Sequence, residues 1–223
     1  IEGSLATVSE DNSVKQRYAI NFRGSVHDRA IALRDLTLVG EAEVKDVILT
    51  HLHYDHAGNL DLFPKATFHL QDSEMTYATG RYMAHAPFSF AYDVNDITYL
   101  LRENYRGRVA FHEGDAQLAQ GISLHHIGGH TLGLQAVRVW TRIGWLVLAS
   151  DAAHYYANME EKRPFPIVAD VTRMVAGYAR LKALADAPRF VIPGHDPEVL
   201  RRYAPPSPSL NGIVARLDTE PLY

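Results

Sequence analysis

One short stretch constrains this chain more than any other. Residues 47–50 are apolar or β-branched, in a strand expected to begin near Val44, and they lead directly into His51-Leu52-His53-Tyr54-Asp55-His56. The apolar run predicts a buried strand, on which alternation would place His51 and His53 on one face. Asp55 and His56 are expected on the turn that follows. Because neutral imidazoles and carboxylates are ligands of catalytic zinc, the stretch predicts a metal site at the end of a buried strand.

Three later strands are expected to end at a potential ligand in the same way. Gly129-His130 follows residues 122–127, Ser150-Asp151 follows residues 145–149, and Pro193-Gly194-His195 follows residues 190–192. Ligands gathered from several strand ends onto one edge of a sheet form a rigid site. Five histidines and two aspartates exceed the needs of one zinc ion and suit two metals that share a bridging carboxylate.

The rest of the chain alternates strand and helix patterns, which predicts a layered α/β protein. Hydrophobic periodicity and capping residues place helices over residues 30–39, 73–83, 96–104, 170–185 and 197–203. Further strands are expected over residues 15–22, 66–70 and 108–112, and a hairpin over residues 134–149. The aromatic-rich connection over residues 84–98 either fills core or walls a pocket for an apolar substrate.

Composition excludes several functional classes. The chain of 223 residues is long enough for one sizeable core, and a net charge of −4 without a basic tract argues against nucleic acid as a partner. The absence of cysteine removes disulfides, thiolate ligands and a cysteine nucleophile. No apolar run reaches transmembrane length, so we expect no membrane insertion and a cytoplasmic protein.

Taken together, the motifs resemble the metallo-β-lactamase superfamily. The order His51-Leu52-His53-Tyr54-Asp55-His56, then His130, Asp151 and His195, matches the H-x-H-x-D-H, H, D, H series of that family. The resemblance implies an α/β fold, the αββα sandwich of the metallo-β-lactamase type, with the site at one edge. It also implies one metal on His51, His53 and His130, a second on Asp55, His56 and His195, and Asp151 as the bridge between them.

Within the family, the ligand set looks like those of the N-acyl homoserine lactonases and the glyoxalase II thioesterases, and the segments 150–158 and 193–197 favour the lactonases. The resemblance implies two Zn²⁺ ions, although nitrogen and oxygen ligands also accept iron, manganese or cobalt. Two metals lower the pKa of a bridging water, so that a bridging hydroxide can attack a lactone carbonyl at neutral pH. Asp55 is placed to deliver a proton to the leaving alkoxide.

The resemblance departs from the family at two places. The similar lactonases carry a tyrosine three residues after the bridging aspartate, whereas this chain has His154, followed by Tyr155 and Tyr156. These three residues are the candidates for contacting the substrate or assisting its oxyanion. The segment before the metal motif also lacks an aspartate-threonine-glycine turn. We therefore expect a single hydrolase domain over residues 1–223, with an atypically short leader over 1–42 and a tail over 204–223.

The predicted function is a dinuclear-metal hydrolase that opens N-acyl homoserine lactones, which are quorum signals. The partner is then a small-molecule lactone or ester, and a homodimer is left open. The alternatives are a pyridoxolactonase-like enzyme for a ring-fused lactone, a glyoxalase II-like thioesterase, a β-lactam hydrolase and a metal-binding module without activity. Arg201 and Arg202 are the candidate basic residues that a glutathione thioester would need.

Overall fold

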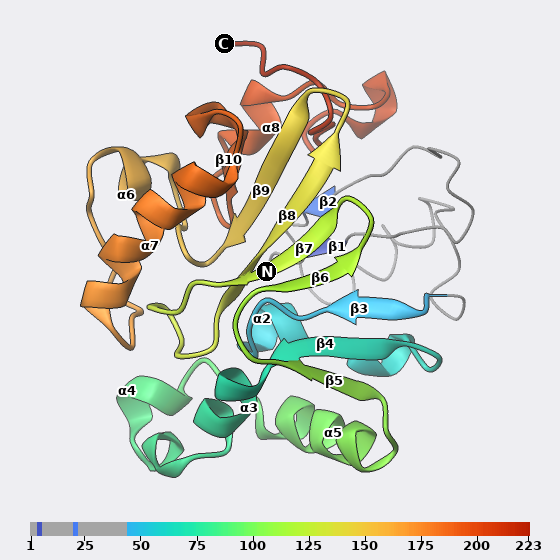
Figure 1. Ribbon diagram of the computed structural model, residues 1–223, viewed down its shortest axis with the longest axis vertical. Helices are drawn as coiled ribbons and strands as arrows, with labels where there is room; N and C mark the ends of the chain where they lie inside the picture. Colours follow the sequence, from blue (N-terminus) through green and yellow to red (C-terminus); the bar gives the residue numbers. More distant parts are fainter. Residues whose placement is uncertain (1–3, 6–19, 22–43) are drawn as a thin grey trace.

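The computed structural model describes residues 4–5, 20–21 and 44–223, and its described part is built on two main sheets (Figure 1). The predictions of a strand over residues 15–22 and a helix over 30–39 lie largely or wholly outside the described residues. Only Ile20–Asn21 of that region is placed, as strand β2, which pairs antiparallel with β1 at Ser4–Leu5.

The first main sheet is parallel and has the order β3-β4-β5. Its side of the molecule carries the helices α3, α4 and α5 (Figure 1). The sheet packs its apolar residues, including Phe68 and Leu70, with Met75 of α3 and Leu100 of α5 in one buried cluster. The elements of this half are β3 Asp46–Ile48, α2 Tyr54–Ala57, β4 Thr67–Gln71, α3 Asp72–Ala78, α4 Ala86–Ser89, α5 Val94–Tyr105 and β5 Val109–His112.

The second main sheet has the order β10-β9-β8-β7-β6 and is antiparallel except where β10 runs parallel to β9. Helix α7 packs on this sheet through Met174, Tyr178 and Leu181, which recur at helical spacing and are buried. The elements of this half are β6 Ala116–Ala119, β7 Ile122–His126, β8 Gln135–Thr141, β9 Gly144–Ser150, α6 Tyr156–Glu160, α7 Val171–Leu184, β10 Val191–Pro193 and α8 Val199–Arg202.

Buried hydrogen bonds join the two sheets at the end that carries the metal motif. The side chain of Gln135, at the start of β8, donates to the carbonyl oxygens of Leu49 and His69 and accepts from the side chain of Gln71. Its backbone N–H donates to the carbonyl oxygen of Thr50, 2.9 Å away. The fold is therefore the αββα sandwich expected for the metallo-β-lactamase type, with two sheets face to face and helices outside.

Several local predictions need correction. Strand β3 ends at Ile48 rather than near Thr50, because the Thr50 carbonyl turns to Gln135 of the other sheet. His51 and His53 thus lie beyond the strand and not on its face. The helix expected over 73–83 stops at Ala78, where the Thr79 hydroxyl donates back to the Met75 carbonyl.

The sequence patterns do not predict the short elements, which lack a strong apolar periodicity. Strand β6 is the edge strand of its sheet and pairs only with β7, so it carries no buried apolar alternation. The helices α4 and α6 span only four and five residues. Helix α5 begins at Val94, two residues before the expected start, because the Asp93 side chain caps the N–H of Asn95. Among the described residues, no helix has the length and apolarity to cross a membrane.

Gly129 fixes the loop between β7 and β8 against helix α7. Its φ is +93°, and a Cβ added there would lie 2.6 Å from the backbone nitrogen of Met174 in α7. The Gly129 carbonyl also accepts hydrogen bonds from the N–H groups of Ala169 and Asp170. A side chain at this position would therefore push the loop off the helix, together with His130, which follows it in the chain.

We expect Gly129→Ala to lower the free energy of unfolding by roughly 3 kcal/mol, from positive-φ strain and overpacking together. Urea unfolding would measure this loss. Gly107→Ala is the matched control, because Gly107 has a φ of +73° with nothing within 4 Å of the added Cβ. It should show the conformational part alone, about 1–2 kcal/mol. Equal losses in the two variants would contradict the close packing of Gly129 on α7.

Candidate metal centre

Seven histidine and aspartate side chains meet where the two sheets join. His51 and His53 follow β3, and Asp55 and His56 lie on α2. His130 comes from the loop after β7, Asp151 from the residue after β9 and His195 from the second residue after β10. The structure thus brings together all seven predicted metal ligands, from segments that are far apart in the sequence.

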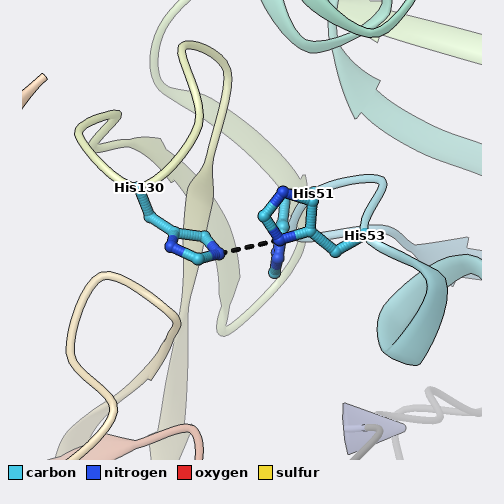
Figure 2. Close-up of side chains that lie close together, drawn as sticks. All are labelled: His51, His53 and His130. Carbon is cyan, nitrogen blue, oxygen red and sulfur yellow. Dashed lines mark hydrogen bonds between the residues drawn. The ribbon is translucent and has the colours of Figure 1, made fainter. Parts of the chain in front are cut away.

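The donor atoms form overlapping groups of three. Within each group, one donor atom per residue lies within 4.8 Å of the others. Figure 2 shows His51, His53 and His130 converging, with His130 Nε2 only 2.9 Å from His53 Nδ1. The groups that involve only predicted ligands are His51, His53 and His130; His51, His56 and Asp151; and Asp55, His56 and His195.

Asp151 lies between the first and the last of these groups. Its Oδ1 is 3.3 Å from His56 Nε2 and 3.0 Å from His195 Nε2. Its Oδ2 is 3.4 Å from His130 Nε2 and 3.8 Å from His51 Nε2. One carboxylate therefore faces histidines of both groups, which is the position a bridging ligand needs.

Buried atoms without a hydrogen bond test whether these residues suit a metal. His51 Nε2, His56 Nε2 and Asp151 Oδ1 are buried and have no partner in hydrogen-bond geometry, although His56 Nε2 and Asp151 Oδ1 are close. Buried polar atoms in native proteins are rarely left in this state. All three are lone-pair donors directed into one cluster, so the donor set fits a divalent metal.

The electrostatics favour the neutral form of three of the imidazoles and the ionised form of the carboxylate. Burial lowers the pKa of His51 well below its usual value, lowers that of His53 to about 2 and lowers that of His130 to about 4. Burial alone would raise the pKa of Asp151, but His56 and the hydrogen bonds from His154 and His195 outweigh it and hold that pKa well below the usual range. Neutral histidine and ionised aspartate are the forms that bind metals.

A backbone contact also orients one of the rings. The Nδ1–H group of His130 donates to the carbonyl oxygen of Ile167 at 2.7 Å, which leaves Nε2 as the lone-pair nitrogen facing the cluster. Hydrogen bonds of this kind fix the tautomer and the direction of metal-binding histidines.

The three candidates for substrate contact lie in different surroundings. His154 Nε2 is 3.0 Å from Asp151 Oδ2, and its ring stacks on Phe165 with centroids 3.5 Å apart. Tyr155 is 45% exposed, with its ring 6.5 Å from that of His154. Tyr156 is buried and packs under the guanidinium of Arg202, 3.8 Å from its ring. Of the three, His154 is the side chain that touches the cluster.

The predictions missed one buried group next to the cluster. Glu74, in the first turn of α3, is fully buried and accepts hydrogen bonds from residues beside the ligands. The sequence carried a weak signal for it, since an acidic residue early in a helix is ordinarily explained by the helix dipole.

Comparison with known proteins identifies the class to which this site belongs. The model of the metallo-beta-lactamase superfamily matches residues 25–195, which include every residue of the cluster. The chain belongs to this superfamily.

The more similar relatives are named as lactonases. N-acyl homoserine lactonase AiiB of Rhizobium rhizogenes is 35% identical over 130 residues, which are 56% of this chain and 46% of that protein. N-acyl homoserine lactonase AttM of Agrobacterium fabrum is 30% identical over 160 residues, which are 70% of this chain and 60% of that protein. The chain thus spans about half the length of the curated relatives it matches.

Solved structures agree on the fold. A quorum-quenching N-acyl homoserine lactone hydrolase superposes with a TM-score of 0.62 at 25% identity, over 76% of this chain and 64% of that one. A quorum-quenching N-acyl homoserine lactone lactonase, at 20% identity, superposes with a TM-score of 0.65 over 88% of this chain and 89% of the other.

Metal removal should lower stability. A metal present at 100 times its dissociation constant stabilises the folded state by about 2.7 kcal/mol, so we expect Tm to fall on chelation and to recover on addition of zinc. Differential scanning calorimetry would measure both changes. Asp151→Asn should abolish most of the zinc-dependent shift. Asp115→Asn, outside the cluster, should keep it, and loss of the shift in both variants would argue against a specific site.

The metal-free protein should become less stable as pH falls from about 6.5 to 4. The folded-state pKa values of His51, His53 and His130 are lowered, so below 6.5 the unfolded chain binds protons that the folded chain does not. His56 opposes this trend, because Asp151 raises its pKa against the effect of burial. Urea unfolding of metal-free protein at pH 7 and pH 5 would measure the net slope, and equal or greater stability at pH 5 would contradict the burial of neutral imidazoles.

Proposed function

We propose that this chain is a metal-dependent hydrolase that opens the ring of N-acyl homoserine lactones. The observation that carries the proposal is the position of Asp151, whose two oxygens face histidines of two separate donor groups. The names of the relatives at 35% and 30% identity support the choice of substrate.

In this proposal the donor groups hold two divalent metals, with zinc as the expected ion. His51, His53 and His130 would hold one, Asp55, His56 and His195 the other, and Asp151 would bridge them. When bound, the pair supplies Lewis acidity for the substrate carbonyl and a low-pKa water at neutral pH.

The chain's own residues supply orientation and proton transfer. Asp55 lies at the rim of the cluster, with its side chain 17% exposed and Oδ2 3.5 Å from His56 Nε2. A carboxylate at this edge can take the proton that the attacking water releases and pass it to the alkoxide that leaves when the ring opens. The Ile167 carbonyl meanwhile holds His130 in one tautomer, so its lone pair stays directed at the cluster.

His154 is our candidate for the substrate contact. Its side chain is 16% exposed, so it is buried at Asp151 on one side and accessible on the other. Stacking on Phe165 holds the ring in place. Its Nε2–H group donates to Asp151 Oδ2 in this structure, and this is the group that would instead donate toward the carbonyl oxygen on which charge develops.

A series of aromatic rings leads away from the cluster and suits an apolar acyl group. The ring of Tyr92 lies edge-on to His53 at 4.6 Å between centroids, and Tyr77 lies 6.2 Å beyond Tyr92. Tyr82 follows at 5.8 Å from Tyr77, and Phe88 at 6.0 Å from Tyr82. Tyr82 is 47% exposed, so the series reaches the surface.

The basic residues that a glutathione thioesterase would need have other contacts. Arg202 stacks on Tyr156, and Arg201 pairs with Glu198 at 3.2 Å. Neither contact favours the thioesterase over the lactonase.

The test is hydrolysis of short- and long-chain acyl homoserine lactones, followed by proton release. We expect metal-dependent turnover, with a fall in kcat/KM of at least about 100-fold in Asp151→Ala. His154→Ala should lower kcat more than it raises KM, because it removes a contact that matters mainly in the transition state.

Asp115→Asn serves as the control variant and should retain activity. No turnover by protein shown to hold two metals would exclude acyl homoserine lactones as substrates. The same sample would then be tested with ring-fused lactones, thioesters and β-lactams.

A further inference from the structure

We propose that Glu74 is a positioning residue that holds together the two loops carrying the ligands of one metal. The inference rests on the proposed metal centre, and it assigns a role to a buried carboxylate outside the seven ligands.

Glu74 satisfies four donors with two oxygens. Its Oε1 accepts from the backbone N–H of Leu52 at 3.0 Å and from the hydroxyl of Tyr92 at 3.1 Å. Its Oε2 accepts from the Thr131 hydroxyl and from the backbone N–H of Gly133 at 3.0 Å. Because all four partners donate, the arrangement calls for an ionised carboxylate, which only accepts.

These donors come from the two loops that meet at the metal cluster. Leu52 lies between His51 and His53, and Thr131 directly follows His130. One carboxylate therefore bonds to the His51–His53 segment through one oxygen and to the loop of His130 through the other. His51, His53 and His130 form one of the donor groups. Glu74 therefore sets the distance between the two loops that supply this group.

Two further contacts support this role. A Cβ on Gly133 would lie 2.1 Å from the backbone nitrogen of Glu74, so the loop after His130 approaches α3 as closely as only glycine allows. Tyr92, which donates to Glu74, also places its ring edge-on against His53. The carboxylate thus acts on a ligand ring as well as on two backbones.

The test is metal affinity, measured by competition with a chromophoric chelator, in Glu74→Gln. Glutamine keeps the shape of the side chain, but its NH₂ group replaces one oxygen and then faces two hydrogen-bond donors. The two loops therefore lose the carboxylate that holds them together. We expect metal affinity to fall 10- to 100-fold, as is typical when an outer-shell partner is removed. The absorption spectrum of the cobalt-substituted protein should change as well, since it reports ligand geometry.

Glu103→Gln is the matched control. Glu103 is also fully buried and pairs with Arg106 and Arg108, but it lies in α5 and contacts none of the cluster residues through these bonds. This variant should lose stability and keep wild-type metal affinity and cobalt spectrum. Tyr92→Phe removes one of the four hydrogen bonds without adding a donor, so it should fold and show a smaller loss of affinity than Glu74→Gln.

The outcomes separate the two proposals. Wild-type affinity and an unchanged cobalt spectrum in both Glu74→Gln and Tyr92→Phe would overturn the role of Glu74 and leave the metal centre intact. An equal loss of affinity in Glu103→Gln would also overturn it, because the effect would then follow general stability. Wild-type protein that binds no metal would overturn the proposed function, and the positioning role with it.

Discussion

The arrangement of the site depends on one carboxylate surrounded by imidazoles. Asp151 is buried, and its oxygens lie between 3.0 and 3.8 Å from nitrogens of His51, His56, His130 and His195. An ionised carboxylate out of contact with water needs opposite charge or donors around it. His51 and His130, whose pKa values are lowered, supply no proton to it, and unpartnered buried atoms remain in the cluster, as expected of a site that binds a cation.

The fold provides this convergence because both sheets end at the same place. Gln135 joins the ends of β3 and β4 to the start of β8, so the loops after β3 and β7 are held against each other. Glu74 makes a second connection between the same two loops, because it accepts hydrogen bonds from the Leu52 N–H and from the Thr131 hydroxyl. The ligands are thus held by hydrogen bonds between sheets, which places them more rigidly than loops alone would.

Much of this could be predicted from the sequence, because ligands that follow apolar strands leave a local pattern. This pattern predicts four of the ligands, namely His51, His130, Asp151 and His195. Glu74 and Gln135 left no such pattern, since their roles depend on partners 57 and 86 residues away in the sequence. The sequence also does not predict edge strand β6 and the short helices α4 and α6, because elements of four or five residues carry too little hydrophobic periodicity.

The number of histidines in this chain is less informative than what their nitrogens contact. His69 and His125 are buried, and each has both ring nitrogens bonded to protein groups, His69 to His112 and Asp46, His125 to Asp115 and Ser123. The contacts of His125 resemble a serine-histidine-aspartate triad. In a catalytic triad the serine is accessible and the aspartate is buried, whereas here Ser123 is buried and Asp115 is partly exposed. His51 and His56 instead each keep a buried nitrogen without a partner. An unpartnered buried nitrogen, rather than buried histidine as such, therefore separates His51 and His56 from the structural histidines, whereas His53 and His130 are assigned to the cluster by their convergence with His51.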